Sequence, residues 1–493
     1  MENKDKSLNE KARSGVAWSA LERFGQQGCA FAVQIVLARL LAPEQFGLIA
    51  MVAVFIAISN VLIDAGFSRA LIQRKELTDL DVTSVFYFNL LIAILLAIFL
   101  YTVAPEIAQF YDSDELISIV RVLSIGLIFS GLGAVHKAKL SREMRFKRLF
   151  FVSFPATLVG GTVGIVLALN GYGVWALVAQ SLLMKFITTV LLWMHTGWRP
   201  SLAFDYNCIR EMFPYGSRLA VSGVLDTAFS NLYVLVIGKV FTPIEVGLFQ
   251  RARSFQQLPV QNVQSIIGRV AFPLFSSIQD DPARMKRGLR KAILLVSLLV
   301  LPGMALLSAI AEPMILLLIG EQWQAAVPLL KLLCVVGALY PLHAMNLNLL
   351  AAIGRSDLFL RLEIIKKVLI VLNIAITYRY GVQAMICGMI ITSIIALVLN
   401  TYYTKKFVDY GVGEQLVDMS RLIVVSLAIW GIAMLCVSAL SDAHGYALLA
   451  STASGAVILL VGMRWFGSAI QDEMVKVLKR LPFGGSVAKL IFK

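Results

Sequence analysis

The sequence carries little charge for its length. Of its 493 residues, 15% are Asp, Glu, Lys or Arg and 58% are hydrophobic, whereas about a quarter of the residues of a soluble domain are charged. The apolar residues come in runs of roughly 20, each long enough to cross the ~30 Å hydrocarbon core of a bilayer as a helix. Short alternating segments, which are typical of membrane β-barrels, do not dominate the sequence. The composition therefore predicts an all-α polytopic membrane protein.

Other scarcities argue against several function classes. The five cysteines follow no pairing pattern and the four histidines lie far apart in the sequence, so we expect neither structural disulfides nor a metal site. No phosphate-binding G-x-x-x-x-G-K-[ST] motif is present, which argues against ATP-driven transport by this chain alone. The predicted external loops are too short for a catalytic domain. We therefore expect a protein that is not an enzyme, with no cofactor and no catalytic residue.

A duplicated stretch organises the chain. Residues 36–48, VLARLLAPEQFGL, return without a gap as residues 236–248, VIGKVFTPIEVGL. The proline and glycine at these offsets predict a tight connection between two helices. Two further pairs follow in the same order: Tyr172–Ala176 with Tyr380–Ala384, and Arg121–Gly126 with Lys331–Gly337. Three echoes in one order indicate two similar halves.

The halves are predicted to contain six spans each, followed by two accessory spans. The expected spans are 15–39, 46–66, 84–104, 116–135, 149–169, 174–194, 214–238, 247–278, 292–311, 324–350, 358–378, 382–403, 422–440 and 446–463. The expected domains are an N-terminal arm (1–13), a first six-helix bundle (14–195), a linker (196–211), a second six-helix bundle (212–404), a loop with the accessory helices (405–463) and a basic tail (464–493). The first apolar run follows a charged arm and is too long and polar for the core of a cleavable signal peptide.

An even number of spans per half gives both halves the same orientation. This predicts two bundles related by a pseudo-two-fold axis along the membrane normal, with a cleft between them. Such a cleft is typical of transporters that alternate access to the two sides. The duplication therefore predicts transport by rocking of the halves.

The positive charge of the chain is unevenly distributed. The net charge of +14 admits nucleic acid as a partner, but its placement favours a membrane. With both termini placed in the cytoplasm, 33 of the 44 Lys and Arg residues fall in cytoplasmic segments and 3 at external edges. This is a strong positive-inside bias. The basic loops also suit the anionic lipids of the inner leaflet.

Charged groups inside the spans are costly and usually face a cavity or a partner. The planar guanidinium group of arginine can bind two phosphate oxygens at once. We therefore predict that arginines within the spans, together with nearby amide side chains, bind an anionic ligand. These residues are Arg23, Arg218, Arg251, Arg253, Arg269, Asn262 and Gln261. Glu22 and Asp226 are the predicted ion-coupling residues. Alternatives stay open: Glu22 can neutralise Arg23 locally, Arg218 can reach the inner interface, and Arg269 can pack against the tail and headgroups.

The span at 247–278 is the most polar of all. Pro259 is expected to break or kink it. Arg251 and Arg253 differ by about 200° around a helix, so both cannot point straight into one cavity. Two acidic pairs, Asp79-Leu-Asp81 and Asp112-Ser-Asp114, fit the D-x-D pattern of metal-dependent glycosyltransferases. No nucleotide-binding βαβ unit surrounds them, so we interpret them as ordinary loop residues.

Several motifs together resemble one membrane family. They are Ser14–Ser19, Val36–Arg39, Gln45–Leu48, Leu71–Glu76, Arg269–Phe275, Ile278–Asp281, Gly320–Trp323 and Leu332–Gly337. The chain resembles the Wzx-type polysaccharide transporters, of the colanic-acid exporter type, in the multidrug/oligosaccharidyl-lipid/polysaccharide (MOP) flippase superfamily. This resemblance implies a V-shaped pair of bundles in a bacterial inner membrane. It also implies transport of an undecaprenyl-pyrophosphate-linked repeat unit to the outer leaflet, commonly driven by H⁺ or Na⁺, for surface-polysaccharide synthesis.

The implied partners are the lipid-linked oligosaccharide, membrane lipids, and the polysaccharide polymerase and chain-length machinery. One alternative is a drug/cation antiporter of the same superfamily, which would need a cavity of carboxylates and aromatics, whereas cations outnumber carboxylates in these spans. A membrane-embedded polymerase or ligase would need a large external loop. A scaffolding role in a biosynthetic complex would leave the charges within the spans unexplained.

Overall fold

A computed structural model of the chain describes residues 25–64, 67, 71, 77–441 and 443–463, and their side chains except those of 262–274. Every regular element in this described part is a helix, which confirms the predicted all-α class. Contacts divide the chain into two compact units, unit 1 (Met1–Gly247) and unit 2 (Leu248–Lys493). The predicted second bundle begins earlier, at residue 212. The predicted domain boundaries come from the sequence repeat, whereas the two units are defined by contacts. The predicted boundaries therefore stay a prediction.

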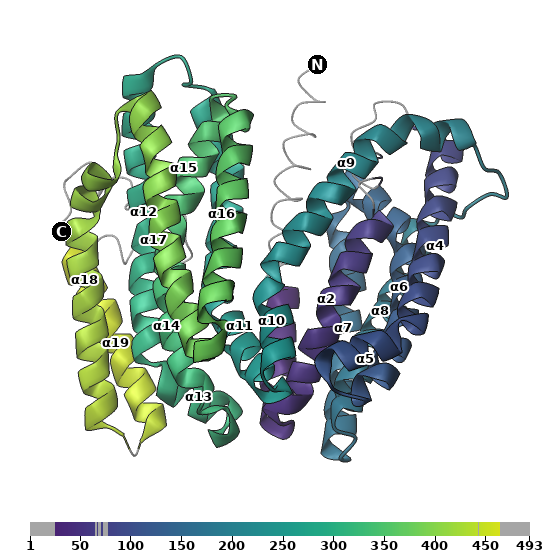
Figure 1. Cartoon of the computed structure of the whole chain (residues 1–493), viewed down its shortest axis with the longest axis horizontal. Coiled ribbons are helices and arrows are strands. Elements are labelled where there is room, and N and C mark those ends of the chain that lie inside the picture. The colour runs from purple at the N-terminus through teal and green to yellow at the C-terminus, as the bar shows by residue number, and fades with distance from the viewer. Residues whose placement is uncertain (1–24, 65–66, 68–70, 72–76, 442, 464–493) are drawn as a thin grey trace. The chain divides into compact units, whose positions relative to one another are not determined.

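Unit 1 is a helical bundle whose last long segment is bent (Figure 1). Its described helices are residues 25–40, α2 (Pro43–Asp64), α4 (Asp79–Thr102), α5 (Ala104–Tyr111), α6 (Glu115–Arg142), α7 (Phe146–Leu169), α8 (Val174–Thr196), α9 (Tyr206–Ser230) and α10 (Leu232–Val240). Helices α9 and α10 meet at an angle of 46°. Both pack against α2, and this packing assigns them to unit 1.

The helices of unit 2 are α11 (Pro243–Ser276), which begins in unit 1, α12 (Pro282–Ala309), α13 (Ala311–Ile319), α14 (Ala326–Ala338), α15 (Tyr340–Ala352), α16 (Ser356–Thr377), α17 (Val382–Val408), α18 (Val412–Ala439) and α19 (His444–Met463). From α11 to α17, unit 2 follows the order of α2 to α8 in unit 1, with α14 and α15 together in the place of α6, and then adds two helices. The short helices α5 and α13 come at equivalent places, each directly after a long span. The predicted spans left both as loops, because eight or nine residues are too few to cross a bilayer.

The duplicated stretch builds the same helix start twice. Pro43 and Pro243 are the first residues of α2 and α11, where proline loses no intrahelical hydrogen bond. Two residues further on, a side chain accepts a hydrogen bond from the amide that precedes the proline. Gln45 Oε1 accepts from Ala42 N at 3.1 Å, and Glu245 Oε2 accepts from Thr242 N at 3.2 Å. The predicted tight connection between two helices is confirmed in both copies.

The glycines of this stretch meet the prolines of the other copy. A methyl group on Gly47 would lie 1.8 Å from the carbonyl oxygen of Pro243, and one on Gly247 would lie 1.9 Å from that of Pro43. Neither site has room for a side chain. The second echo is also structural, because Gly173 and Gly381 adopt φ of +56° and +94° directly before α8 and α17.

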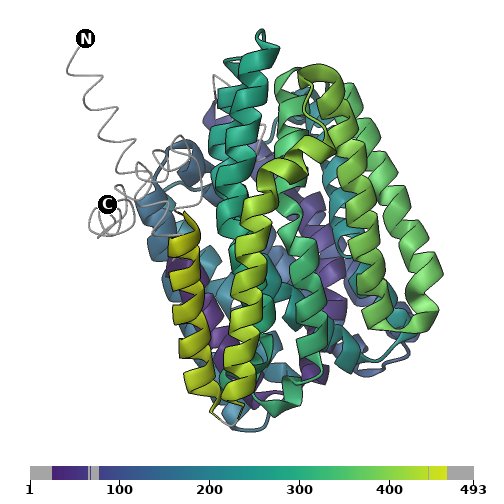
Figure 2. The same ribbon diagram turned by 90° about the vertical axis from the view of Figure 1, so that its left-hand side faces the viewer.

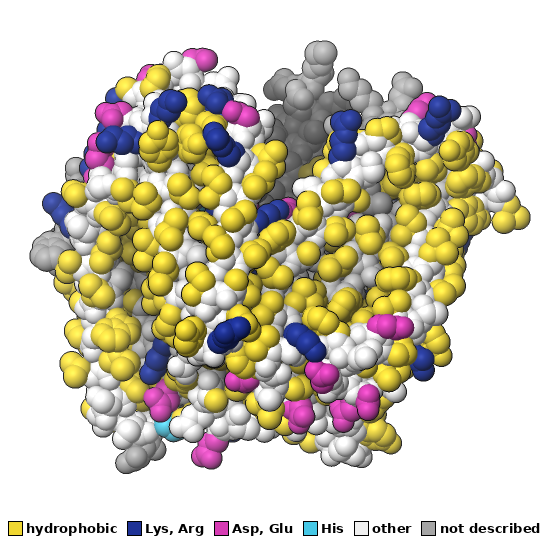
Figure 3. All heavy atoms as spheres, in the orientation of Figure 1, with side chains coloured by type: hydrophobic (Ala, Val, Ile, Leu, Met, Phe, Trp, Pro, Cys, Tyr) yellow, Lys and Arg dark blue, Asp and Glu magenta, His cyan; other side chains and the backbone are white. Residues whose placement is uncertain are grey.

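Hydrophobic side chains face outward along the helices of both units (Figure 3). On α4, for example, Leu91, Leu95 and Ile98 are 55%, 56% and 57% exposed. Such a surface is stable only in lipid. Ten helices of the described part are long and apolar enough to cross a membrane, and the bent α9–α10 pair makes an eleventh. The chain is thus a multi-pass membrane protein, and the count of fourteen spans stays a prediction.

The accessory helices α18 and α19 lie side by side on unit 2 (Figure 2). At one end of α18, Lys286 Nζ of α12 lies 2.8 Å from Glu414 Oε2. Nearby, Asp418 accepts a hydrogen bond of 2.8 Å from the Tyr410 hydroxyl and forms an ion pair with Arg290. The hydrogen bond to Glu414 raises the pKa of Lys286, and burial followed by the bond to Asp418 raises the pKa of Tyr410. Polar contacts therefore attach α18 to α12.

Candidate functional site

The two predicted arginines of α11 have different surroundings. The guanidinium of Arg251 lies 5.3 Å from the centre of the Trp323 ring, and Arg251 is 9% exposed while Trp323 is fully buried. Arg253 is half-buried, as expected for two side chains that point about 200° apart. Arg251 thus occupies the interior of unit 2, where an aromatic face stabilises its charge.

Helix α11 is uninterrupted at Pro259, so a break there is wrong, while a kink stays a prediction. Neighbouring helices can accommodate a proline inside a membrane helix, because they supply other partners for the freed backbone groups. One turn earlier, Gln256 is buried against Gly337 of α14, where a methyl group would lie 2.4 Å from Gln256 Nε2. Gln261 is exposed and donates a hydrogen bond of 3.5 Å to Gln257.

The predicted residues of α9 lie away from the core of unit 1. Arg218 and Asp226 are both exposed. The buried residues of α9 are Cys208, Ile209, Met212, Gly216 and Ala220. Glu22 and Arg23 fall outside the described residues, as do the side chains of Asn262 and Arg269. The binding and ion-coupling roles given to these residues therefore stay predictions.

Both acidic D-x-D pairs have structural roles. Asp81 Oδ2 accepts a hydrogen bond of 2.9 Å from the Thr78 amide, and Asp81 N donates to the Thr78 hydroxyl, which together form the N-terminal cap of α4. Asp112 ends α5 in the left-handed conformation and pairs with Lys239 at 2.9 Å. Among the described residues no group of three or more His, Cys, Asp or Glu side chains is placed to hold a metal ion.

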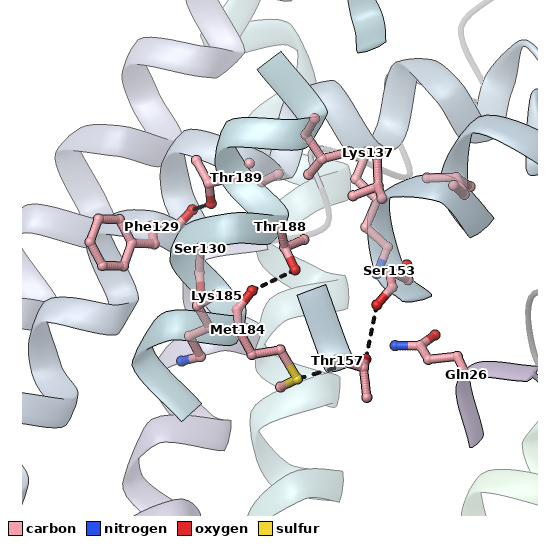
Figure 4. A pocket seen from close by; sticks show the side chains of 15 residues that line it. Gln26, Phe129, Ser130, Lys137, Ser153, Thr157, Met184, Lys185, Thr188 and Thr189 are labelled. Atoms are coloured by element: carbon pink, nitrogen blue, oxygen red, sulfur yellow. Dashed lines mark hydrogen bonds between the residues drawn. The ribbon is translucent and has the colours of Figure 1, made fainter. Parts of the chain in front are cut away.

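The described part of unit 1 contains a cavity of about 310 Å³ between α6, α7 and α8, with Gln26 of the first helix at its edge. Its polar lining consists of two lysines, five hydroxyl side chains and one amide. These residues are Lys137, Lys185, Ser130, Ser153, Thr157, Thr188, Thr189 and Gln26. Among the described residues that line it, none is Asp or Glu. In Figure 4 Lys137 extends toward Ser153, and Gln26 faces Thr157.

Glycine residues allow the helices that line this cavity to pack closely. Gly160 and Gly164 of α7 face Gln180 and Met184 of α8 so closely that a methyl group at either glycine would lie 3.0–3.1 Å from α8 atoms. Close approach through small residues is a usual mode of helix packing in membranes. On α6, Gly126 leaves room for the side chain of Lys185, whose Nζ would lie 3.2 Å from a methyl group at that position.

The sequence contains a pattern that points to this cavity, but selecting residues by their charge did not reveal it. Polar side chains recur at intervals of three and four residues on two successive spans, as in Ser153/Thr157 on α7 and Lys185/Thr188/Thr189 on α8. Such spacing puts them on one face of each helix. The sequence alone does not show that these faces meet. Our prediction selected arginines instead, because a guanidinium matches phosphate.

The long apolar helices and their outward-facing hydrophobic side chains define a multi-pass α-helical membrane protein. The solved structure of the lipid II flippase MurJ in an inward closed conformation matches 91% of this chain and 98% of its own, with a TM-score of 0.73 and 14% sequence identity. At this identity the match shows the fold alone.

The chain belongs to the polysaccharide biosynthesis protein family, whose sequence profile matches residues 36–328. It is 27% identical over 407 residues to the lipopolysaccharide biosynthesis protein WzxC of Escherichia coli (strain K12), covering 81% of this chain and 82% of that one. It is 28% identical over 318 residues to the succinoglycan biosynthesis transport protein ExoT of Rhizobium meliloti (strain 1021), covering 64% of each. The predicted Wzx-type family is confirmed.

Proposed function

We propose that this protein moves a lipid-linked polysaccharide repeat unit from the cytoplasmic to the outer leaflet of a bacterial inner membrane. The observation that carries the proposal is family membership combined with cationic and hydroxyl side chains inside the bundle. ExoT is named as a transport protein and MurJ as a lipid II flippase, so relatives in sequence and in fold share the proposed class of activity. The polyprenyl tail would stay in lipid while the glycan passes through the protein.

The proposed polar path begins with the anionic part of the substrate. Arg23, Arg218, Arg251 and Arg253 would attract the pyrophosphate, since guanidinium groups bind phosphate oxygens at two points. Arg269, Asn262 and Gln261 would contact the same group or the first sugars. The buried setting of Arg251 supports this choice, because a charge within a membrane helix is costly unless it has a function.

Transport in one direction needs an energy source, and the sequence contains no G-x-x-x-x-G-K-[ST] motif that would bind ATP. We propose that H⁺ or Na⁺ moves with the cycle and that Asp226 and Glu22 exchange it. A bound cation shifts the balance of inward-open and outward-open states only by its different affinity for the two. Cytoplasmic termini, supported by the distribution of Lys and Arg, would place the basic loops on the side where the substrate is made. A polymerase with its chain-length machinery would take up the product outside.

The proposal is tested by leaflet exchange in proteoliposomes. The substrate is a fluorescent undecaprenyl-pyrophosphate oligosaccharide, and the label left in the outer leaflet is quenched at intervals. Wild-type protein is expected to exchange it faster under an imposed pH or Na⁺ gradient than without one. Empty liposomes, and liposomes holding an unrelated membrane protein of similar size, give the background.

Two variants connect this activity to the proposed residues. Arg251→Gln is expected to slow exchange at least tenfold, and Asp226→Asn to remove the response to the gradient while leaving slow exchange. Arg421→Gln, which removes an exposed cation of α18, is the control. Failure of wild-type protein to move any acidic or neutral repeat unit under either gradient would count against the proposed function. Undiminished exchange by Arg251→Gln would assign that arginine to packing with Trp323.

The drug/cation antiporter is disfavoured by the same interior. The described lining of the cavity in unit 1 contains two ammonium groups and no carboxylate, so it would repel an organic cation. The polymerase or ligase alternative would need catalytic residues in a large external loop, whereas the connections between the described helices are short.

A further inference from the structure

The hydroxyl groups in the cavity between α6, α7 and α8 are placed to accept hydrogen bonds from a ligand. Four of these groups already donate their hydrogen to a backbone oxygen. The bonds are Ser130 to Gly126 at 3.0 Å, Thr157 to Ser153 at 2.9 Å, Thr188 to Met184 at 2.7 Å and Thr189 to Phe129 at 2.9 Å. A hydroxyl has one hydrogen and two lone pairs. These four side chains therefore offer a ligand acceptor oxygens and no donor. Figure 4 draws the bonds of Thr157, Thr188 and Thr189.

Positive charge is the second property of this cavity. Lys137 and Lys185 line it. Within the described part of the chain, neither lysine takes part in an ion pair or a hydrogen bond. An ammonium group donates hydrogen bonds and accepts none. A charged side chain in a span is costly and usually faces a partner or a functional cavity. The two lysines therefore need an anionic partner, and none of the described lining residues supplies one.

A ligand of this cavity must donate hydrogen bonds to the hydroxyl oxygens and carry negative charge for the lysines. A phosphate or pyrophosphate has acceptor oxygens and would satisfy the lysines but meet the acceptor oxygens of the hydroxyl side chains. A neutral sugar would donate to those oxygens but leave both ammonium groups without a counter-charge, and an amino sugar would add a third positive charge. A sugar ring bearing a carboxylate supplies hydroxyl donors and an anion at once. The volume of about 310 Å³ lies at the small end of ligand sites.

We propose that this cavity binds the acidic sugar of a carboxylated repeat unit. The inference rests on the proposed transport function and names the substrate class for a site inside unit 1. Lys185 binds the carboxylate, Lys137 stands nearer the entrance, and Thr157, Thr188 and Ser130 accept hydrogen bonds from the sugar hydroxyls. Gln26, whose amide both donates and accepts, contacts either kind of group.

The position of the lysines along their helices gives the cavity a direction. Lys137 lies one turn before the end of α6, at Arg142. Lys185 lies eleven residues before the end of α8, at Thr196, which corresponds to a depth of about 16 Å. Both ends belong to segments that the charge distribution places in the cytoplasm. The acidic sugar thus enters from the side on which the repeat unit is assembled.

The test is a binding measurement that does not need transport. The full chain is placed in nanodiscs of phosphatidylcholine at low salt and titrated with a galacturonic acid trisaccharide. The same trisaccharide with its carboxyl groups reduced to hydroxymethyl groups, and inorganic pyrophosphate, are titrated in parallel. Wild-type protein is expected to bind the acidic trisaccharide at least tenfold more tightly than either.

Variants separate charge from shape. Lys185→Gln is expected to lower affinity for the acidic trisaccharide at least tenfold and to leave affinity for the reduced one unchanged. Lys185→Arg keeps the charge and is expected to retain most of the binding. Thr188→Val removes an acceptor and is expected to weaken both sugars alike. Lys331→Gln removes a span lysine of α14 that does not line this cavity, and is the charge-matched control.

Several outcomes would overturn the proposal. One is equal affinity of wild-type protein for the acidic and reduced trisaccharides. A second is equal loss of acidic-trisaccharide binding in Lys331→Gln and Lys185→Gln. Tighter binding of pyrophosphate would assign the lysines to the phosphate end of the substrate. Displacement of the acidic trisaccharide by phosphatidylglycerol, at a lower concentration than by the trisaccharide itself, would assign the cavity to a lipid headgroup.

The proposed function and the proposed ligand fail in different ways. If the protein binds the acidic trisaccharide selectively but moves no lipid-linked substrate, the proposed function fails. If the protein moves acidic and neutral lipid-linked substrates equally well and binds neither trisaccharide selectively, the acidic-sugar site fails while transport stands.

Discussion

The side chains of Asn346 and Gln415 exchange two hydrogen bonds across 69 residues of sequence. Asn346 Nδ2 donates to Gln415 Oε1 and Gln415 Nε2 donates to Asn346 Oδ1, each at 3.0 Å. Both residues are almost fully buried, at 0% and 1% exposure. The pair joins α15 to α18, so an accessory helix is attached to the interior of unit 2 by polar groups as well as by apolar packing.

Breaking this amide pair from one side should cost more than removing it altogether. Gln415→Leu removes the donor to the buried Oδ1 of Asn346, whereas Asn346 Nδ2 keeps its bond to the Leu342 carbonyl oxygen. We expect a loss of about 1–3 kcal/mol in unfolding free energy. The double variant with Asn346→Leu is expected to recover part of that loss. Denaturant unfolding in mild detergent micelles measures both. Additive losses in the double variant would show that the two amides are energetically independent.

Asp418 should contribute more to the unfolding free energy than its ion-pair partner Arg290. Its side chain is 9% exposed and accepts from the Tyr410 hydroxyl, whereas the Arg290 side chain is 57% exposed. We expect Asp418→Ala to lower the unfolding free energy by about 1–3 kcal/mol. Arg290→Gln, the matched control, is expected to cost at most about 1 kcal/mol, because solvent screens the exposed guanidinium of Arg290. Equal losses in the two variants would contradict this ranking.

Alkaline pH should loosen the same end of α18. The pKa of Lys286 is raised in the folded protein by its hydrogen bond to Glu414. A raised pKa means that the pair contributes stability below the unfolded pKa of about 10.4 and loses it as pH rises through the folded value. Distances between spin labels on α12 and α18 should therefore stay constant from pH 7 to 9 and spread above about 10.4. In Lys286→Met the change above pH 10.4 should disappear.

Gly47→Ala should destabilise the protein although alanine is the better helix former. Within an exposed helix this change usually gains about 1 kcal/mol. Here the added methyl group would lie 1.8 Å from the Pro243 carbonyl oxygen, so the two helix starts must separate. Gly303→Ala in α12, where no atom lies within 4 Å of the added carbon, is the control and should hold or raise the melting temperature. A similar rise in both variants would contradict the close contact.

Much of the fold could be predicted from the sequence because lipid permits few solutions. Runs of roughly 20 apolar residues imply helices, and proline and glycine marked where α2, α8, α11 and α17 begin. The helices α5 and α13 escaped prediction because they are short and sit between spans. The bend between α9 and α10 escaped as well, since no proline lies at the Asn231 junction.

The candidate site was harder to predict, and the reason is geometric. Selecting residues by charge found Arg251, which is buried against Trp323, and also Arg218 and Asp226, which lie on the exposed face of α9. It passed over the serines and threonines of α6, α7 and α8, because a hydroxyl in an apolar span is common. Their importance depends on which helix faces meet, and one sequence does not specify that.

The reciprocal contact of the two P-x-x-x-G stretches explains why the duplication is still visible there. Gly47 is confined by Pro243, and Gly247 is confined by Pro43, so each copy sets the limits within which the other can mutate. A side chain added at either glycine would therefore displace the helix start of the other copy as well as its own.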